Sequence, residues 1–142
     1  MKRISVIIVF ALMFLVGCGQ MSDALPKIEE YKWTMFSVQS KEDGMAIAYG
    51  ERGSSTLDTA KQLELTCTAE NGSLSIADKT NNKSYSGIYK HKETSTESVI
   101  YEVEIDGMEG MAVVSMTAYQ NGEEEPTFII SLEEYSINFY AE

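Results

Sequence analysis

The sequence predicts an all-β domain, an antiparallel meander of about eight or nine strands that closes into a small barrel. From Tyr31 onward, apolar and polar residues alternate with a period of two, the period of side chains on a strand. Asn71-Gly72, Asp106-Gly107 and Asn121-Gly122 separate these alternating segments, and such pairs favour hairpin turns. Closure into a barrel removes the exposed edges that a meander leaves. A β-sandwich is the alternative arrangement.

The expected elements follow from local pattern in chain order. Trp33 and Met35 face inward on the first strand, and a second strand lies over 45–49, with its register left open. Residues 54–62 are the one segment where a helical turn is expected, because a serine there can cap it. Further alternating strands are expected around residues 63–69, 74–76, 85–89, 99–105, 111–119, 128–132 and 135–139.

The start of the chain has the pattern of a secretory signal. Lys2 and Arg3 precede an apolar run over residues 4–16, and Cys18 follows shortly after it. A basic start, a short apolar stretch and a small residue before a cleavage point are typical of signal peptides. A membrane-spanning helix needs about 20 apolar residues, so this run is too short to span. We therefore expect residues 1–17 to form a signal-peptide helix.

Leu15-Val16-Gly17-Cys18 resembles the bacterial lipobox, in which a diacylglyceryl group is placed on the cysteine and the chain is cut before it. The resemblance implies a lipoprotein anchored to the cell membrane at its extracytoplasmic face through acylated Cys18, with the lipid bilayer as a partner. Two acyl chains anchor a protein stably, whereas one holds it only marginally. Residues 18–30 are then the lipidated N-terminus and a short tether, and residues 31–142 are the β-barrel domain.

The mature chain expected from this cleavage is strongly acidic. It holds nine Lys and Arg against 22 Asp and Glu, a net charge of −13. Nucleic-acid binding relies on Lys and Arg that neutralise phosphates, so no nucleic-acid partner is expected. Negative charge keeps an extracytoplasmic domain soluble. The alternative is an acidic patch that recognises a basic partner or a cation.

The domain resembles the small lipocalin-like barrels of many bacterial surface lipoproteins. The resemblance rests on Trp33 in the first strand, Gly87-Ile88-Tyr89 in mid-chain, the short hairpins and the closing aromatic strand over 135–140. It implies a barrel that can hold an apolar cavity, and it names no ligand.

The side chains expected inside the barrel are rich in aromatic residues and Met. An open barrel would present them to a small apolar ligand. The alternative is that they fill the core, where Met occupies irregular gaps. The candidates for a ligand pocket are Trp33, Met35, Tyr85, Tyr89, Tyr101, Met116 and Phe128.

Cysteine and histidine give no sign of catalysis. Lipidation of Cys18 leaves Cys67 without a disulfide partner, and Cys67 lies on the apolar side of an expected strand. A buried thiol is usually inert, and a nucleophilic one needs a nearby base. His91 is far from Cys67 in the sequence, so we expect no catalytic pair.

The carboxylates are expected to be solvated surface acids. Glu102, Glu104 and Asp106 share one face of a strand, and residues 123–125 form an acidic loop. A metal site or an acid–base pair needs convergent geometry that this spacing does not predict. The sequence also lacks zinc spacing, a nucleotide fingerprint and a nucleophile elbow. No enzyme, metal or cofactor is expected.

These patterns together favour a membrane-anchored, extracytoplasmic, non-catalytic binding module. Its partner is expected to be a small apolar ligand or, as the alternative, a protein bound by an interaction or inhibitor-type surface. An open barrel interior favours the first function. A filled barrel with an exposed aromatic patch favours the second.

Overall fold

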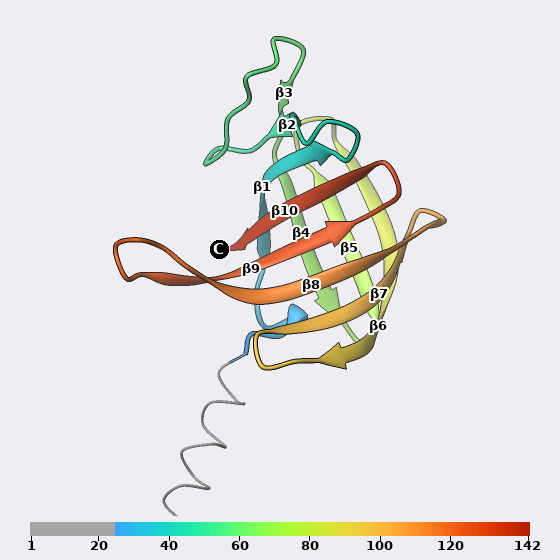
Figure 1. Ribbon diagram of the computed structural model, residues 1–142. Helices are drawn as coiled ribbons and strands as arrows, with labels where there is room; N and C mark the ends of the chain where they lie inside the picture. Colours follow the sequence, from blue (N-terminus) through green and yellow to red (C-terminus); the bar gives the residue numbers. More distant parts are fainter. Residues whose placement is uncertain (1–24) are drawn as a thin grey trace, which may run out of the picture.

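The computed structural model describes residues 25–142 (Figure 1). The expected signal-peptide helix, Cys18 and the first part of the tether lie outside these residues. The elements are η1 (Ile28–Glu30), β1 (Trp33–Ser40), β2 (Ala46–Tyr49), β3 (Lys61–Gln62), β4 (Leu65–Glu70), β5 (Ser73–Asp78), β6 (Lys83–Thr94), β7 (Ser98–Ile105), β8 (Met108–Ala118), β9 (Glu124–Ser131) and β10 (Tyr135–Ala141). Between residues 25 and 142, no helix is long and apolar enough to cross a membrane.

Eight strands form a closed antiparallel barrel. Their order is β1-β4-β5-β6-β7-β8-β9-β10, and β10 closes the ring by pairing with β1 from Trp33↔Ala141 to Ser40↔Tyr135. The all-β class and the barrel are therefore confirmed, and the β-sandwich is excluded because the ring is continuous. Two additional strands, β2 and β3, lie outside it at one end (Figure 1).

The chain leaves the barrel after β1 and returns at β4. β1 pairs with β4 only at Trp33 and Thr34, and its C-terminal half pairs with β2 instead. We call β2, β3 and the chain between them (residues 46–62) the flap. Its two strands run parallel, with Ala48 opposite Lys61. The expected meander is thus interrupted once, between its first and second barrel strands.

The expected hairpins are confirmed at all three pairs. At Asn71-Gly72 and Asp106-Gly107 both residues have positive φ, between 50° and 81°, as a type I′ turn requires. At Asn121-Gly122 only the glycine does, with φ 84°. The Asn121 side chain instead accepts a hydrogen bond from the amide of Glu123 within a longer loop.

The expected helical turn over residues 54–62 is wrong. The segment is a run of turns that ends in β3. The Ser55 hydroxyl donates to the carbonyl of Ala46 and accepts from the amide of Leu57. The serine therefore fixes a local turn against β2 instead of capping a helix, a competition that short hydroxyl side chains commonly win.

The tether is shorter than expected at its barrel end. Ile28 belongs to the core with no exposed surface, and Leu25 packs against that core. The reason is that the end of the barrel needs an apolar cover, and these residues supply it. The folded domain therefore begins before Tyr31.

Two glycines let neighbouring strands approach closely. A Cβ on Gly87 in β6 would lie 2.6 Å from the carbonyl oxygen of Glu104, and one on Gly110 in β8 would collide with the carbonyl of Ser131. Glycine inside a strand marks such bends and close approaches. Gly87 and Gly110 thus allow the curvature that closes the barrel.

Candidate functional site

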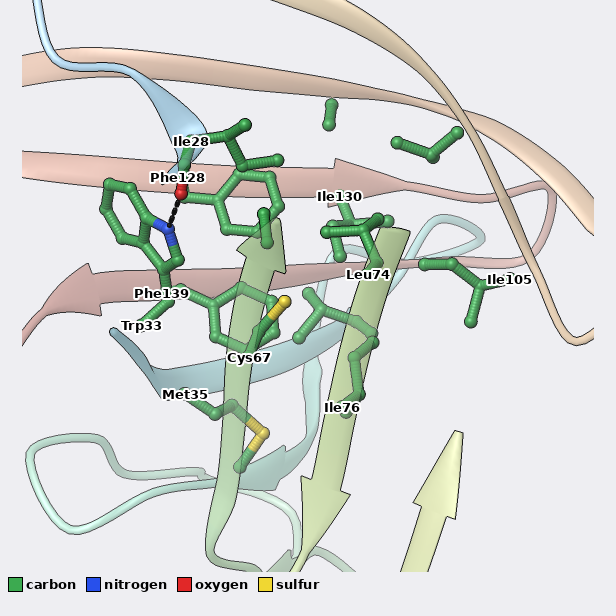
Figure 2. Close-up of a cluster of buried hydrophobic side chains, with 14 of the residues drawn as sticks. Ile28, Trp33, Met35, Cys67, Leu74, Ile76, Ile105, Phe128, Ile130 and Phe139 are labelled. Carbon is green, nitrogen blue, oxygen red and sulfur yellow. Dashed lines mark hydrogen bonds between the residues drawn. The ribbon is translucent and has the colours of Figure 1, made fainter. Parts of the chain in front are cut away.

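One end of the barrel is plugged by η1, and we call it the closed end. The indole nitrogen of Trp33 donates to the carbonyl of Ile28 at 2.9 Å (Figure 2). The Tyr101 hydroxyl accepts from the amide of Ile28 at 3.4 Å, and the Tyr89 hydroxyl donates to Glu29 at 2.8 Å. The plug is therefore held by hydrogen bonds around a fully buried isoleucine.

Aromatic rings fill the interior beside this plug. Trp33 lies 5.3 Å from Phe128 between ring centroids, and Phe128 stacks on Phe139 at the same distance. Figure 2 shows these rings next to Cys67 and Met35. All five side chains are buried. The interior at this end is therefore filled by packed aromatic rings.

The other end of the barrel, which we call the mouth, holds an apolar cavity of about 330 Å³. Barrel strands and the turns between them supply most of its wall, and the flap supplies the rest. Ile47 and Met108 are each more than 40% exposed, so the cavity is open to solvent. The apolar lining consists of Val38, Ile47, Ala48, Leu63, Leu65, Ile76, Ile105, Met108, Leu132 and Ile137.

Asp78 is the buried polar group of the mouth. Its side chain accepts from the amide of Asn81 at 3.0 Å and from the Asn81 side chain at 2.8 Å. Burial alone would raise the pKa of Asp78, but these hydrogen bonds, that of Thr80 and the charge of Lys83 together hold it below its usual value. Asp78 is therefore a structural anion that organises the β5–β6 turn, and both of its oxygens are occupied.

Two phenols frame the cavity. Tyr85 and Tyr135 are both partly buried and pack against the core. Burial raises the pKa of Tyr135, and the neighbouring Tyr85, Glu134 and Asp106 raise it further. The Tyr135 hydroxyl points toward the sulfur of Met108, 4.0 Å away. The rings of Tyr85 and Tyr135 supply apolar contact area to the cavity.

The flap is fastened to the barrel from outside. Arg52 forms a two-pronged ion pair with Glu125 of β9, with nitrogen–oxygen distances of 3.1 and 3.3 Å. Its guanidinium also lies 4.1 Å from the ring centre of Tyr140, and Tyr119 donates to Glu125 at 2.7 Å. We call this arrangement the latch. It connects the flap wall of the cavity to the long β8–β9 hairpin.

The residues expected to line a pocket are distributed over the whole barrel. Trp33, Met35, Tyr101 and Phe128 are buried in the core. Of the seven candidates, only Tyr85 lines the mouth cavity. Tyr89 lies at the closed end, where its hydroxyl bonds to Glu29.

Met116 is not enclosed as the alternation suggested. It follows the inward-facing Val114 in register, but its side chain is 37% exposed. The reason is that β8 pairs with β7 only as far as Ser115, so the β8–β9 hairpin continues past the rim of the barrel. Alternation gives the side of a strand, and it does not give where the barrel ends.

Cys67 lies on β4 and His91 on β6. Cys67 is a buried free thiol, and burial raises its pKa to about 12. At neutral pH almost none of it is the reactive thiolate. His91 is exposed and bonds to the hydroxyl of Thr94 at 2.7 Å. In the part of the chain that the structure describes, no group of three acidic, His or Cys residues could hold a metal ion.

Sequence reasoning missed most of the mouth. Leu63, Leu132 and Asp78 line it, and each lies at or just beyond the end of a strand. Leu63 and Leu132 were placed at the ends of alternating segments, but alternation gives the side of a strand and does not show whether a side chain lines open space. Asp78 is polar and gave no signal of burial.

No family model, no curated protein and no solved structure matches the chain. The barrel therefore rests on the strand pairing itself, and membership of a lipocalin-like family stays a prediction.

Proposed function

We propose that the protein is a membrane-anchored extracytoplasmic lipoprotein whose barrel is a non-catalytic module for binding a small apolar molecule at the mouth. One observation carries the proposal: the interior is filled at the closed end and open at the mouth. Ligand pockets are typically concave, mostly apolar and edged by a few polar groups, and the mouth cavity has this character.

The size of the cavity restricts the ligand. An apolar cavity of about 150 Å³ in another protein is large enough for benzene. The mouth cavity, at about 330 Å³, suits the apolar part of a molecule about twice that size. A larger ligand would have to extend into solvent between the flap and Tyr135.

Ligand binding is testable on the mature chain, residues 18–142, made without lipid by Cys18→Ser. Small apolar molecules added to it should raise its melting temperature and appear as one-to-one complexes in native mass spectrometry. Ala48→Leu places extra atoms in the cavity wall and should weaken binding at least tenfold. Ala118→Leu makes the same change on the exposed β8–β9 hairpin and should have no effect. Unchanged binding by Ala48→Leu would show that the ligand binds elsewhere.

The anchor is tested separately in the native host. The lipobox-like Leu15-Val16-Gly17-Cys18 supports lipidation at Cys18. The unaltered protein should sediment with membranes and carry fatty acyl chains, whereas Cys18→Ser should carry none and lose the association. Cys67→Ser is the matched control, because a buried thiol is not a lipid acceptor. A Cys18→Ser variant that still sediments with membranes contradicts the proposed anchor.

A protein-interaction module is the second candidate. It is favoured by a groove of about 400 Å³ on the outer face of β1, β8, β9 and β10, where Phe36, Tyr119 and Ile129 are exposed. A photo-cross-linker placed at Ile129 would capture a protein partner in cells if this groove is the site. Ile88, which is 59% exposed on β6, is the control position. Equal capture at both positions would argue against this function.

A further inference from the structure

The mouth cavity continues into an acidic groove on the outside of the barrel. The groove has a volume of about 660 Å³ and shares Met108, Leu132 and Tyr135 with the cavity. Four glutamates line it: Glu104 and Glu109 from β7 and β8, and Glu133 and Glu134 from the β9–β10 turn. A molecule held in the cavity would therefore meet these carboxylates as soon as it emerges beside Tyr135.

The charges around this opening are strongly unbalanced. Cavity and groove together are lined by six carboxylates, those of Asp78, Asp106 and the four glutamates, and by a single ammonium, that of Lys61. The Asp78 carboxylate accepts hydrogen bonds from the backbone and side chain of Asn81. The salt bridges between described residues involve Glu142, Glu125 and Glu64, so the remaining five acids have no ion-pair partner within residues 25–142.

Glu104 and Glu109 are an unfavourable pair in the free protein. They are directly opposite each other on β7 and β8. Like charges in this position lie about 5 Å apart at Cβ and are destabilising. Natural proteins retain destabilising arrangements where function requires them. A cation bound in the groove would relieve the repulsion.

Lysines near the groove form no salt bridge with its carboxylates in the described part of the chain, although Lys90 lies beside Glu104 and Glu109 in a neighbouring hollow. Lys61 is exposed on the flap and lies in the cavity lining, not in the groove. Lys41 follows β1, and its amide donates to the carbonyl of Glu134, but its ammonium forms no salt bridge in the described part of the chain. The groove is therefore complementary to a positively charged group.

We propose that the ligand of the mouth is a small cationic amphiphile, with its apolar part in the cavity and its positive group in the acidic groove of Glu104, Glu109, Glu133 and Glu134. The inference rests on the proposed binding function and adds the charge of the ligand. Tyr135 and Met108, which belong to both spaces, would lie at the junction between the two parts of the ligand.

The test compares three probes that share one decyl tail and differ in the head group. Decyltrimethylammonium, decyl sulfate and decyl maltoside are titrated, below their micelle concentrations, into the mature Cys18→Ser chain by calorimetry. The cationic probe should bind about tenfold or more tighter than the other two at low salt. The difference should shrink at about 0.15 M salt, because exposed charges are then screened within about 8 Å.

Removing negative charge from the groove tests whether the groove binds the cationic head group. The double variant Glu133→Gln/Glu134→Gln should bind the cationic probe several-fold more weakly and should bind decyl maltoside with unchanged affinity. The matched control Glu123→Gln/Glu124→Gln removes the same charge from the loop and start of β9 beyond the barrel, and should change neither. Circular dichroism of each variant verifies the fold.

The outcomes separate this inference from the proposed function. If all three probes bind equally, with Ala48→Leu blocking each, the cavity binds apolar molecules and the charge preference is wrong. If the sulfate binds most tightly, the inference is overturned, and Lys61 determines the charge of the ligand. If no probe binds, both the inference and the proposed function fail.

Discussion

The two ends of the barrel are built from the same eight strands, yet they differ in how their side chains are packed and hydrogen-bonded. At the closed end, aromatic rings pack on one another and the polar atoms of Trp33 and Tyr101 bond to η1. At the mouth, apolar side chains line open space, and the acids beside them form no salt bridge in the described part of the chain. The closed end is packed as a core, whereas the mouth has the apolar lining that a ligand pocket would need.

The difference indicates that the stability of the fold and the binding of a ligand depend on opposite ends of the barrel. Close packing with satisfied polar groups stabilises a fold, whereas an open apolar wall and unpaired charges contribute little to it. If this contrast is right, substitutions at the closed end should mainly change the free energy of unfolding. Substitutions at the mouth should mainly change binding.

The largest expected difference is between matched aromatic truncations. Phe128→Ala removes a fully buried ring that contacts Trp33 and Phe139, and should lower the free energy of unfolding by about 3–5 kcal/mol. Tyr135→Ala removes a partly exposed ring at the mouth and should cost less than about 2 kcal/mol. Urea unfolding followed by circular dichroism measures both. Equal losses would contradict the contrast between the two ends.

A smaller effect is expected at Asp78, the one buried acid of the mouth. Asp78→Asn weakens the hydrogen bonds from Asn81 and should cost about 1–2 kcal/mol at neutral pH. Because folding lowers the pKa of Asp78, its contribution is present above the unfolded pKa of about 3.9. It is lost as the pH falls through the lower pKa of the folded state.

The measurement for Asp78 is the stability difference between the unaltered protein and Asp78→Asn as a function of pH. It should shrink toward zero in acid. Asp58→Asn, at an exposed position in the flap, is the control. A difference that stays constant with pH would show that the charge of Asp78 is unimportant.

The smallest expected effect on stability is at the latch. Arg52→Gln breaks an ion pair whose side chains are 46% and 25% exposed, and should cost about 1 kcal/mol or less, and less still in high salt. Lys32→Gln, which breaks the more exposed pair with Glu142, is the control and should cost less than Arg52→Gln. Because the latch fastens the flap, Arg52→Gln should also speed ligand release in stopped-flow measurements. An unchanged release rate would show that the flap does not depend on Arg52.

Much of the fold follows from local pattern. Nine strands were placed by alternation, and three hairpins by Asn-Gly or Asp-Gly, because both signals depend on neighbours in the chain. The flap was misjudged because Ser55 bonds to Ala46, nine residues away, and β3 is too short for periodicity to reveal it. Ile28 was assigned to the tether because the apolar residues there, Leu25 and Ile28, do not alternate as those of a buried strand do.

By itself, the sequence determined which side of each strand is apolar, where the chain turns, and that the expected mature protein is acidic; it also predicts the anchor at Cys18. Only the tertiary structure decided which inward residues fill the barrel and which surround a cavity. That choice depends on where the β8–β9 hairpin extends beyond its pairing with β7, where η1 plugs the interior, and where the flap forms part of the cavity wall. These features depend on contacts between residues far apart in the chain, such as Arg52 and Glu125, which are 73 positions apart, and no local pattern encodes them.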